Sequence, residues 1–386
     1  MKPVKESLDK KTILCVAQLP PPIHGASLVH SYIVDSNIIK ETFNIEVVNL
    51  QFAKSINQLK KFSFLKIYKA IFHGHEILKK IIYSKPDLVY YSLSPTGYAF
   101  YRDALYVSIF KIFKIKIVFH LHGKGIRNNA NSSQLKKIIY RWVFNNTNVI
   151  CLSEILTADI ANVYKLKPFI VPNGIPQYLN SSPSIGTTKT GNIPQILFLS
   201  NFIQDKGVII LIEALSILKN KGLVFTARLV GAPSNISVKS LEEKIRTCSL
   251  EKIVKVIGPR YEQDKIREFI NSDIFVFPTF YKNEAFPLVI LEALQFELPV
   301  ISTFECSIPE IIIDNETGLL VQSKNVEMLA EKIALLINDK RLRIELGKKG
   351  FERYKNNYTI NHFENKINDV FKKIIYSLPL YYVLLF

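Results

Sequence analysis

The fold of this chain is decided by the stretch from Ile274 to Ser302, which reads IFVFPTFYKNEAFPLVILEALQFELPVIS. Apolar runs open and close this stretch, and the residues between them carry the pattern of a helix. Pro287 stands where a first helical turn would begin, a position where the missing N–H of proline costs nothing, and residues 288–296 continue as good helix formers. The stretch therefore predicts a strand, a loop, a helix and a second strand in succession.

Two carboxylates lie in this stretch with seven residues between them. Glu284 falls on the loop that enters the predicted helix, and Glu292 falls inside the helix. A carboxylate accepts hydrogen bonds from two hydroxyls of a sugar or a ribose, while the N–H groups and the dipole of a helix N-terminus suit a phosphate. The spacing therefore predicts a nucleotide-sugar pocket.

Outward from this stretch, strand-like apolar runs alternate with helical ones along the chain. Residues 87–91 are followed by a helical pattern at about 98–113 and a strand-like run at 115–119, and a second series starts at 195–200. This alternation is typical of parallel sheets covered by helices. Residues 176–192 are rich in Pro, Ser, Thr, Gly and Asn and indicate a linker. The sequence thus predicts an α/β protein of two Rossmann-like domains.

Ordered motifs extend the pattern on both sides of the carboxylates. In chain order they are Gly25, His120-Leu121-His122-Gly123, Val171-Pro172-Asn173-Gly174, Leu197-Phe198-Leu199-Ser200-Asn201, Asp205-Lys206-Gly207, Leu229-Val230-Gly231, Ile257-Gly258, Ser307-Ile308-Pro309-Glu310-Ile311 and Glu316-Thr317-Gly318-Leu319-Leu320. With the E-x7-E element they resemble the retaining glycosyltransferases of family 4 (glycosyl transferases group 1), of the bacterial surface-polysaccharide type. The resemblance is nearly continuous from about 195 to 321. It implies the GT-B fold, in which two Rossmann-like domains with parallel sheets face a central cleft.

The resemblance also gives the predicted domains their roles. An acceptor-side domain is expected at 1–178 and a linker at 179–192. A nucleotide-sugar-binding domain is expected at 193–355, and a C-terminal helix at 356–386 is expected to return to the first domain. A length of 386 residues fits two such domains better than one core.

Three residues of the second predicted domain take roles from the resemblance. Glu284 matches the acid that contacts the donor sugar on the face where the bond breaks, and Glu292 matches the acid that holds the ribose hydroxyls. Lys206, just ahead of a predicted helix, would neutralise the leaving diphosphate. Each residue also has a simpler interpretation. Glu284 would only complement a helix dipole, Glu292 would be an exposed helix residue, and Lys206 would be a surface lysine.

Other donor contacts are expected around these three residues. Phe286, Pro287 and Leu288 form the predicted helix start, where the donor would lie. Asn201 stands where the family usually has an arginine, which puts the second cation in doubt; Arg260 or Lys282 would have to supply that charge.

In the first predicted domain, Gly25 follows the first strand, where the absence of a side chain lets the backbone approach a phosphate. An ordinary turn glycine is the alternative. His24 is a weaker candidate for facing the acceptor. His120 and His122 end an apolar strand two residues apart and share one face of it. The resemblance favours His122 as a catalytic residue that reaches the cleft, against a buried structural histidine.

The sequence predicts neither a metal nor a bound cofactor beyond the donor itself. It has no D-x-D dyad, and the pairs His120/His122 and His73/His75 lack a third ligand nearby in sequence. Cation side chains and helix dipoles would replace a metal, so activity should persist in a chelator. The four cysteines are scattered, which fits a reducing cytoplasm rather than a disulfide framework.

The net charge of +17 is concentrated in the first half of the chain. Up to Tyr178 there are 24 Lys and Arg against 10 Asp and Glu, whereas the remainder has 26 against 23. Eight lysines between residues 54 and 85 are interleaved with apolar residues, as in a basic amphipathic helix that attracts anionic lipid. A solvated helix face is the equal alternative. Nucleic acid is excluded as a partner because no recognition motif accompanies the charge.

Together these observations predict an enzyme. It would transfer a hexose or an N-acetylhexosamine, with retention, from a nucleotide-diphosphate sugar to a glycan or lipid-linked acceptor in surface-polysaccharide assembly. It would work in the cytoplasm or on the inner face of the cell membrane. Two alternatives remain open: a GT-B nucleotide-sugar epimerase, and a catalytically weakened subunit that docks on a membrane enzyme.

Overall fold

The structure is a computed structural model that describes residues 10–52, 64–178 and 193–377. The predicted linker at 179–192 lies outside the described residues, and so do Lys54, Lys60 and Lys61 of the basic segment.

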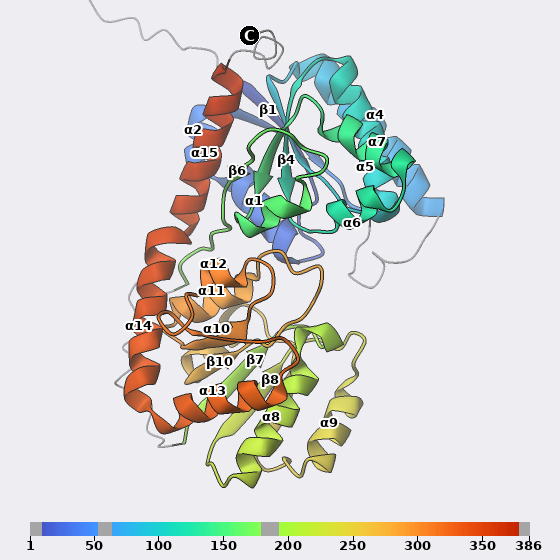
Figure 1. Cartoon of the computed structure of the whole chain (residues 1–386). Helices are drawn as coiled ribbons and strands as arrows, with labels where there is room; N and C mark the ends of the chain where they lie inside the picture. The colour runs from blue at the N-terminus through green and yellow to red at the C-terminus, as the bar shows by residue number, and fades with distance from the viewer. Residues whose placement is uncertain (1–9, 53–63, 179–192, 378–386) are drawn as a thin grey trace, which may run out of the picture. The chain divides into compact units, whose positions relative to one another are not determined.

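The chain divides into two compact units (Figure 1). Unit 1 contains residues 1–173 and 360–386, and unit 2 contains residues 174–359. Unit 2 is therefore inserted into unit 1 in sequence. The chain enters and leaves unit 2 at paired residues, because Ile175 forms a parallel bridge with Thr359 and its N–H donates to the carbonyl of Tyr358 at 3.0 Å.

Unit 1 is built on a six-stranded parallel sheet in the order β2-β1-β3-β4-β5-β6. Its strands are β1 (Thr12–Ala17), β2 (Asn44–Asn49), β3 (Leu88–Ser92), β4 (Lys116–Leu121), β5 (Asn148–Cys151) and β6 (Phe169–Ile170). The central strands β1, β3 and β4 are almost fully buried. Their continuous apolar runs are what a sheet covered on both faces requires.

Helices cover both faces of this sheet. They are α1 (Gly25–Asp35), α2 (Asn37–Thr42), α4 (Phe64–Ser84), α5 (Gly97–Ile112), α6 (Ile126–Asn131), α7 (Gln134–Phe144) and α15 (Ile360–Tyr376), with a 3-10 turn η1 (Ile155–Asp159). Figure 1 shows α4, α5 and α7 together on one face, while α15 contacts α1, α2 and β3 on the other. On α15, the Phe371 ring meets those of Phe43 and Tyr90 edge-on.

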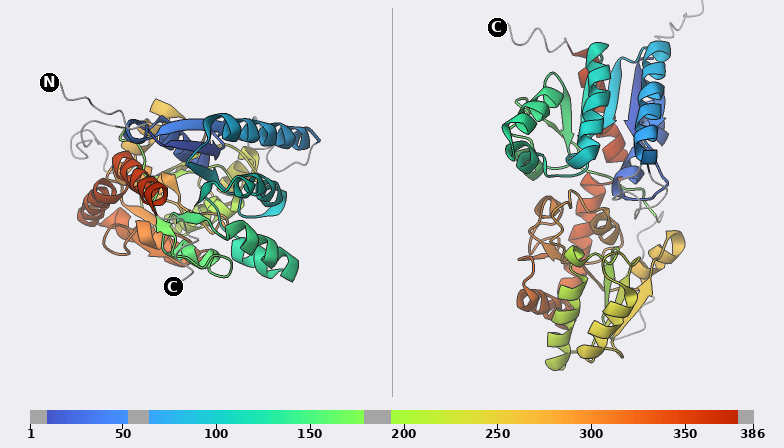
Figure 2. Two further views of the ribbon diagram at one scale, coloured as in Figure 1. Left: turned by 90° about the horizontal axis from the view of Figure 1, so that it is seen from above. Right: turned by 90° about the vertical axis from the view of Figure 1, so that its right-hand side faces the viewer.

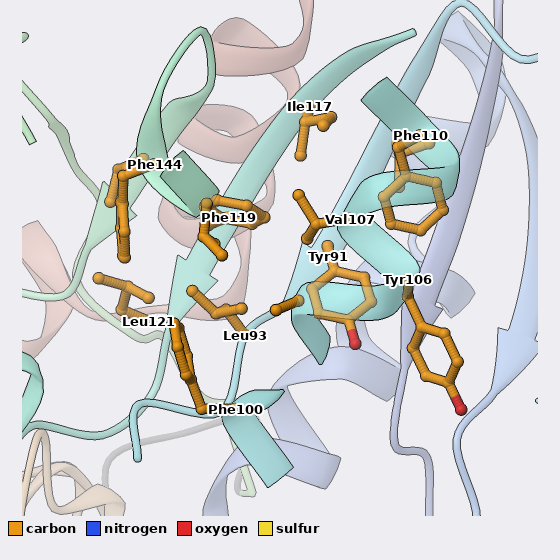
Figure 3. Close-up of a cluster of buried hydrophobic side chains, with 14 of the residues drawn as sticks. Tyr91, Leu93, Phe100, Tyr106, Val107, Phe110, Ile117, Phe119, Leu121 and Phe144 are labelled. Atoms are coloured by element: carbon orange, nitrogen blue, oxygen red, sulfur yellow. The ribbon is translucent and has the colours of Figure 1, made fainter. Parts of the chain in front are cut away.

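An aromatic core fills the space between the sheet and the helices α5 and α7 (Figure 3). Phe100 of α5 stacks on Tyr140 of α7 with ring centroids 3.7 Å apart, and the Tyr140 hydroxyl donates to the carbonyl of Pro95 at 2.8 Å. Phe119 of β4 packs edge-on against Phe144. Close packing of such large rings holds α5 and α7 in fixed positions on the sheet.

Unit 2 repeats the architecture with a six-stranded parallel sheet in the order β12-β11-β10-β7-β8-β9. Its strands are β7 (Gln195–Leu199), β8 (Thr226–Val230), β9 (Val254–Gly258), β10 (Ile274–Val276), β11 (Val300–Thr303) and β12 (Leu319–Val321). Its helices are α8 (Val208–Asn220), α9 (Val238–Thr247), α10 (Glu262–Ile270), α11 (Leu288–Gln295), α12 (Ile308–Ile311), α13 (Val326–Asn338) and α14 (Lys340–Asn357), with a 3-10 turn η2 (Gln204–Lys206). None of the described helices in either unit combines the length and apolarity needed to cross a membrane.

The stretch from Ile274 to Ser302 folds as its sequence predicts, into β10, a loop, α11 and β11. One detail differs. Pro287 is the N-cap of α11, with an extended ψ of 107°, and the helix begins at Leu288. The two parallel sheets with covering helices confirm the α/β prediction of two Rossmann-like domains.

Candidate functional site

Lys206 lies at the carboxyl end of β7, a central strand of unit 2, in the turn that leads into α8. It ends η2, and the next residue, Gly207, has a φ of 86° and is the N-cap of α8. A Cβ on Gly207 would stand 2.1 Å from the carbonyl oxygen of Pro278. Only glycine permits this approach, so the backbone itself holds Lys206 beside the loop that follows β10.

Lys206 and Glu284 form an ion pair, which joins two residues that lie 78 positions apart. Their side chains are only 14% and 11% exposed. The ammonium of Lys206 also lies 5.3 Å from the ring centroid of Phe277 and 4.9 Å from that of Tyr281. A cation enclosed by a carboxylate and two aromatic faces is better fixed than a surface lysine.

Glu292 is buried in α11, with 6% of the residue exposed, so it is not an exposed helix residue. Its Oε1 accepts hydrogen bonds from Lys265 Nζ at 2.6 Å and from the Tyr178 hydroxyl at 3.0 Å. A carboxylate at this depth requires such partners, because an isolated buried charge is costly. Lys265 belongs to α10, whereas Tyr178 follows the point at which the chain enters unit 2.

Tyr178 is itself held in place by α11 and its C-cap. Its backbone N–H donates to Gln295 Oε1 at 2.7 Å, and its ring stacks on Phe296 with an interplanar angle of 14°. Lys265 Nζ lies 5.5 Å from the centroid of the Tyr178 ring. Glu292, Lys265 and Tyr178 therefore form one connected polar group.

At the start of α11, backbone N–H groups rather than side chains are available to bind a ligand. Phe286 is buried and its ring packs edge-on against Tyr358 with centroids 6.0 Å apart. Pro287 is buried as well, and Leu288 is half-buried. These predicted donor contacts thus depend on the N-terminal N–H groups of α11, which favour an anion.

Asn201, Arg260 and Lys282 bear on the second cation that the resemblance leads us to expect. Asn201 is exposed and follows β7, so it shares the β7–α8 connection with Lys206. Arg260 lies with its Nε 3.6 Å from Glu268, which already accepts two hydrogen bonds from Arg228. Lys282 is exposed on the same loop as Glu284, which makes it the better placed of the two predicted substitutes.

In unit 1, Gly25 is the first residue of α1, and His24 is its N-cap. His24 Nδ1 accepts from the N–H of Ser27 at 3.3 Å, and Ser27 Oγ accepts from the N–H of His24 at 3.0 Å. His24 thus satisfies donors at the start of α1. The loop that follows β1 therefore ends at His24, and Gly25 stands at the first position of α1 rather than in that loop.

The rings of His30, His120 and His122 gather in unit 1, near the carboxyl end of β4. The ring centroids of His120 and His122 are 4.0 Å apart, and those of His30 and His122 are 4.7 Å apart. His30 Nδ1 bonds the carbonyl of Gln18 at 2.9 Å, and His120 Nδ1 bonds the hydroxyl of Tyr90 at 2.8 Å. The two histidines at the end of β4 therefore do lie side by side, but His30 of α1 was not foreseen.

Burial keeps these three imidazoles neutral. Loss of hydration lowers the pKa of His30 to about 4 and that of His120 and His122 well below the ordinary value. Repulsion from neighbouring histidines, His24 among them, contributes to the lowered pKa of His30 and His122. The Nε2 atoms of all three rings are buried and have no hydrogen-bond partner among the described residues. A neutral, desolvated imidazole can still donate or accept one hydrogen bond there.

No group of three or more His, Cys, Asp or Glu side chains within the described part of the chain is arranged to hold a metal ion. The cluster of His30, His120 and His122 is likewise not arranged to hold a metal ion. The site residues of unit 2 offer instead one enclosed ammonium, two carboxylates and two helix starts.

Lys265, Tyr178 and His30 are the residues that sequence reasoning missed. Lys265 precedes Glu292 by 27 positions and Tyr178 precedes it by 114, so no local spacing signals either contact. Lys206 and Glu284 could be predicted from the sequence, because each belongs to a motif that follows a strand. Gly25 and His122 belong to unit 1, whereas the other predicted site residues belong to unit 2.

Comparisons with known proteins match the second unit to a family. Residues 186–353 match the family described as glycosyl transferases group 1. An uncharacterized glycosyltransferase of Methanocaldococcus jannaschii is 27% identical over 300 residues, covering 77% of this chain and 78% of that protein. The capsular polysaccharide biosynthesis glycosyltransferase CapM of Staphylococcus aureus is 31% identical over 162 residues, but the match spans only 41% of its length.

The fold also has a solved counterpart. The structure of HepE from Anabaena in complex with UDP superposes with a TM-score of 0.71 at 21% identity, covering 94% of this chain and all of that one. This likeness confirms the predicted GT-B fold. The group 1 match falls on the unit that carries Lys206, Glu284 and Glu292.

Proposed function

We propose that this chain is a retaining glycosyltransferase. It would move a hexose or an N-acetylhexosamine from a nucleotide-diphosphate sugar to a glycan or lipid-linked acceptor in bacterial surface-polysaccharide assembly. The observation that carries the proposal is the enclosed Lys206–Glu284 ion pair. Its two residues precede α8 and α11 in the chain, and it shares unit 2 with the buried Glu292. A cation and two helix N-termini suit the diphosphate of an activated sugar, and two carboxylates suit its hydroxyls.

The comparisons support this reaction class. The group 1 family covers the proposed donor-binding unit, and the named relatives are glycosyltransferases, one of them in capsular polysaccharide biosynthesis. HepE, which shares the fold, binds UDP.

The chemistry assigned to each residue follows from its setting. The bond between the anomeric carbon and the diphosphate oxygen breaks, and the diphosphate leaves with the electron pair. Lys206 and the N-terminus of α8 would stabilise that charge. Glu284 would hold the donor sugar, and Glu292 would accept the ribose hydroxyls in exchange for its bonds to Lys265 and Tyr178.

The acceptor side of the reaction is also part of the proposal. The acceptor hydroxyl would form the new bond on the same face of the sugar, and its proton would pass to the departing phosphate oxygen. Gly25 and His122 would contribute from unit 1, the first through backbone close to a phosphate and the second through its buried Nε2. A lipid-linked acceptor would place the enzyme at the inner face of the membrane.

Metal independence belongs to the same proposal, with Lys206 meeting the charge that a divalent ion would otherwise meet. Transfer should persist in excess chelator at close to its full rate. Complete loss of activity that magnesium or manganese restores would overturn this part.

The central experiment uses the purified full chain and a panel of uridine and guanosine diphospho-sugars. One donor should raise the melting temperature, because a ligand at about 100 times its Kd adds about 2.7 kcal/mol of stability. The same donor should be consumed when the acceptor is present. Lys206→Met and Glu284→Gln should lower turnover at least about 100-fold, as removal of a group that meets transition-state charge does. Glu292→Gln should mainly raise KM.

Lys239→Met and Glu242→Gln are the matched controls, since both residues are exposed on α9 of the same unit. Both controls should keep wild-type turnover. Interconversion of the donor without transfer would favour an epimerase, and tight donor binding with no turnover of any donor would favour a docking subunit. NMR of the product's anomeric centre tests retention.

A further inference from the structure

Exposed apolar side chains are concentrated on one set of helices in unit 1. Among the described residues, fifteen large apolar side chains are more than half exposed, and eleven of these lie on α4, α5 and α7. The eleven are Leu65, Tyr68, Ile71, Phe72, Ile82, Tyr83, Tyr98, Leu105, Ile112, Leu135 and Ile138. Single exposed apolar residues are ordinary, but such a concentration marks an interaction surface.

Helix α4 is apolar on both of its faces. His73, Ile77 and Ile81 face the protein at intervals of four residues and are buried. On the opposite side, Tyr68 and Ile71 are 68% and 70% exposed. A helix whose outer side only met water would carry polar residues there.

Helices α5 and α7 continue this surface. Leu105 and Ile112 follow each other on the outer side of α5, and Leu135, Ile138 and Trp142 form an i, i+3, i+7 stripe on α7. Figure 2 (right) shows the three helices side by side over the sheet of unit 1. Contacts join α4 to α5, and Lys111 of α5 lies over the Trp142 ring of α7 at 4.7 Å.

The same three helices are strongly basic. They contain nine Lys and Arg against two Asp and Glu. One of the two acids, Asp103, is fully buried and paired with Arg102. At the flanks of α4, Lys69 Nζ donates to the carbonyl of Gln51 and Lys80 pairs with Glu46, so these lysine side chains lie along the edges of the apolar stripe.

From this arrangement we infer that the outer faces of α4, α5 and α7 dock on an anionic lipid bilayer. The apolar and aromatic side chains would enter the boundary between head groups and acyl chains, with the helices lying in the plane of the membrane. The lysines and arginines around them would meet the anionic head groups. The inference rests on these exposed faces and holds whether or not the proposed sugar transfer is correct.

The composition of the three-helix face favours lipid over a protein partner. Cores of protein interfaces are depleted in lysine, whereas here α4 carries four lysines, α7 carries two and α5 carries one among their exposed apolar residues. A second copy of the same face would bring two strongly basic surfaces together, which is unfavourable. Tyr and Trp among the exposed residues are typical of the membrane interface.

The chain supplies its own probe for this docking. Trp142 is 43% exposed on α7, and the sequence contains one tryptophan. Added to the full-length protein, phosphatidylcholine vesicles containing phosphatidylglycerol should shift Trp142 emission to the blue. Brominated acyl chains should quench this emission. Vesicles of phosphatidylcholine alone should bind at least about tenfold more weakly, and added salt should weaken binding to the anionic vesicles.

A quadruple variant tests the apolar part: Ile71→Gln, Phe72→Gln, Leu105→Gln and Ile138→Gln. Its partition onto anionic vesicles, measured by co-sedimentation, should fall at least about tenfold. The matched control replaces exposed apolar residues elsewhere: Leu166→Gln, Val224→Gln, Leu335→Gln and Ile344→Gln. The control should bind as the wild type does, and circular dichroism melts establish that both proteins fold.

A second pair of variants tests the charge without touching the apolar residues. Lys136→Gln, Lys137→Gln and Arg141→Gln on α7 should reduce the preference for anionic vesicles, whereas Lys239→Gln, Lys252→Gln and Arg341→Gln in unit 2 should not. Three results would each overturn the inference. These are vesicle binding without a change in Trp142 emission, equal binding to neutral vesicles, and a concentration-dependent Trp142 shift without lipid that reports self-association.

Discussion

At the residue scale, the two acids of the E-x7-E element meet different environments. Glu284 pairs with Lys206 between two loops, whereas Glu292 is buried in α11 against Lys265 and Tyr178. The spacing predicts both acids, and the motif before α8 predicts Lys206. Nothing in the sequence predicts Lys265, because its contact with Glu292 is made by two helices whose relative position depends on packing of the whole sheet.

Lys265→Met should destabilise the protein by about 2 kcal/mol, because it leaves the buried Glu292 carboxylate without its cation. Urea unfolding measures the change. Lys265→Met combined with Glu292→Gln should recover part of the loss, since the uncompensated charge is then gone. A double variant less stable than the sum of the single changes would contradict this pairing.

Gly207→Ala should cost about 3 kcal/mol or more and lower donor affinity. The new Cβ combines a left-handed φ of 86° with a contact 2.1 Å from the Pro278 carbonyl, so the loop that carries Lys206 must move. Gly222→Ala is the matched control. It has a φ of 77° but open space around the Cβ, so it should cost only about 1 kcal/mol and leave donor binding unchanged. Equal losses from the two changes would exclude close approach as the cause.

At the scale of elements, the continuous apolar strands and the helix after Glu284 follow directly from sequence pattern. Pro287 shows where such prediction is less exact, because its extended ψ of 107° moves the helix start by one residue. The histidine cluster was only half predictable. His120 and His122 share one strand end, but His30 comes from α1 on a separate crossover, and sequence spacing cannot report that contact.

The histidine cluster should make the protein less stable as the pH falls from about 6.5 towards 4. Burial lowers the pKa of His30 to about 4, so below pH 6.5 the unfolded chain binds a proton that the folded chain refuses, and stability is lost. At pH 5 His30 alone accounts for about 2 kcal/mol. His120, His122 and His24 face His30 and act in the same direction.

Urea unfolding at pH 7 and pH 5 measures this loss. His30→Gln should show a smaller decrease between the two pH values than the wild type does. His75→Gln, a change at an exposed histidine of α4, should show the full wild-type decrease. Identical decreases in wild type and His30→Gln would contradict the assignment.

At the scale of the whole molecule, the chain consists of two α/β units that differ in charge. The basic excess lies mostly before Tyr178, and the structure places much of it on α4, α5 and α7 beside their exposed apolar residues. The sequence predicts the basic amphipathic character of α4. It does not predict that α5 and α7 extend the same face, because that depends on three crossovers lying on one side of one sheet.

Residues 174–359, produced alone, should fold and bind the nucleotide diphosphate of the correct donor. This segment has its own six-stranded sheet and its own core, and it contains Lys206, Glu284 and Glu292. A cooperative thermal transition that rises when the nucleotide is added is the expected result. Absence of any cooperative transition would show that unit 2 depends on unit 1 to fold.

The bridge between Ile175 and Thr359 holds the two ends of unit 2 next to each other. Because both connections to unit 2 lie side by side, the whole unit could be excised with two neighbouring cuts and replaced by another of the same fold. Under the proposed function, recombination at these two connections would exchange the sugar specificity while the strands and helices of unit 1 stay intact.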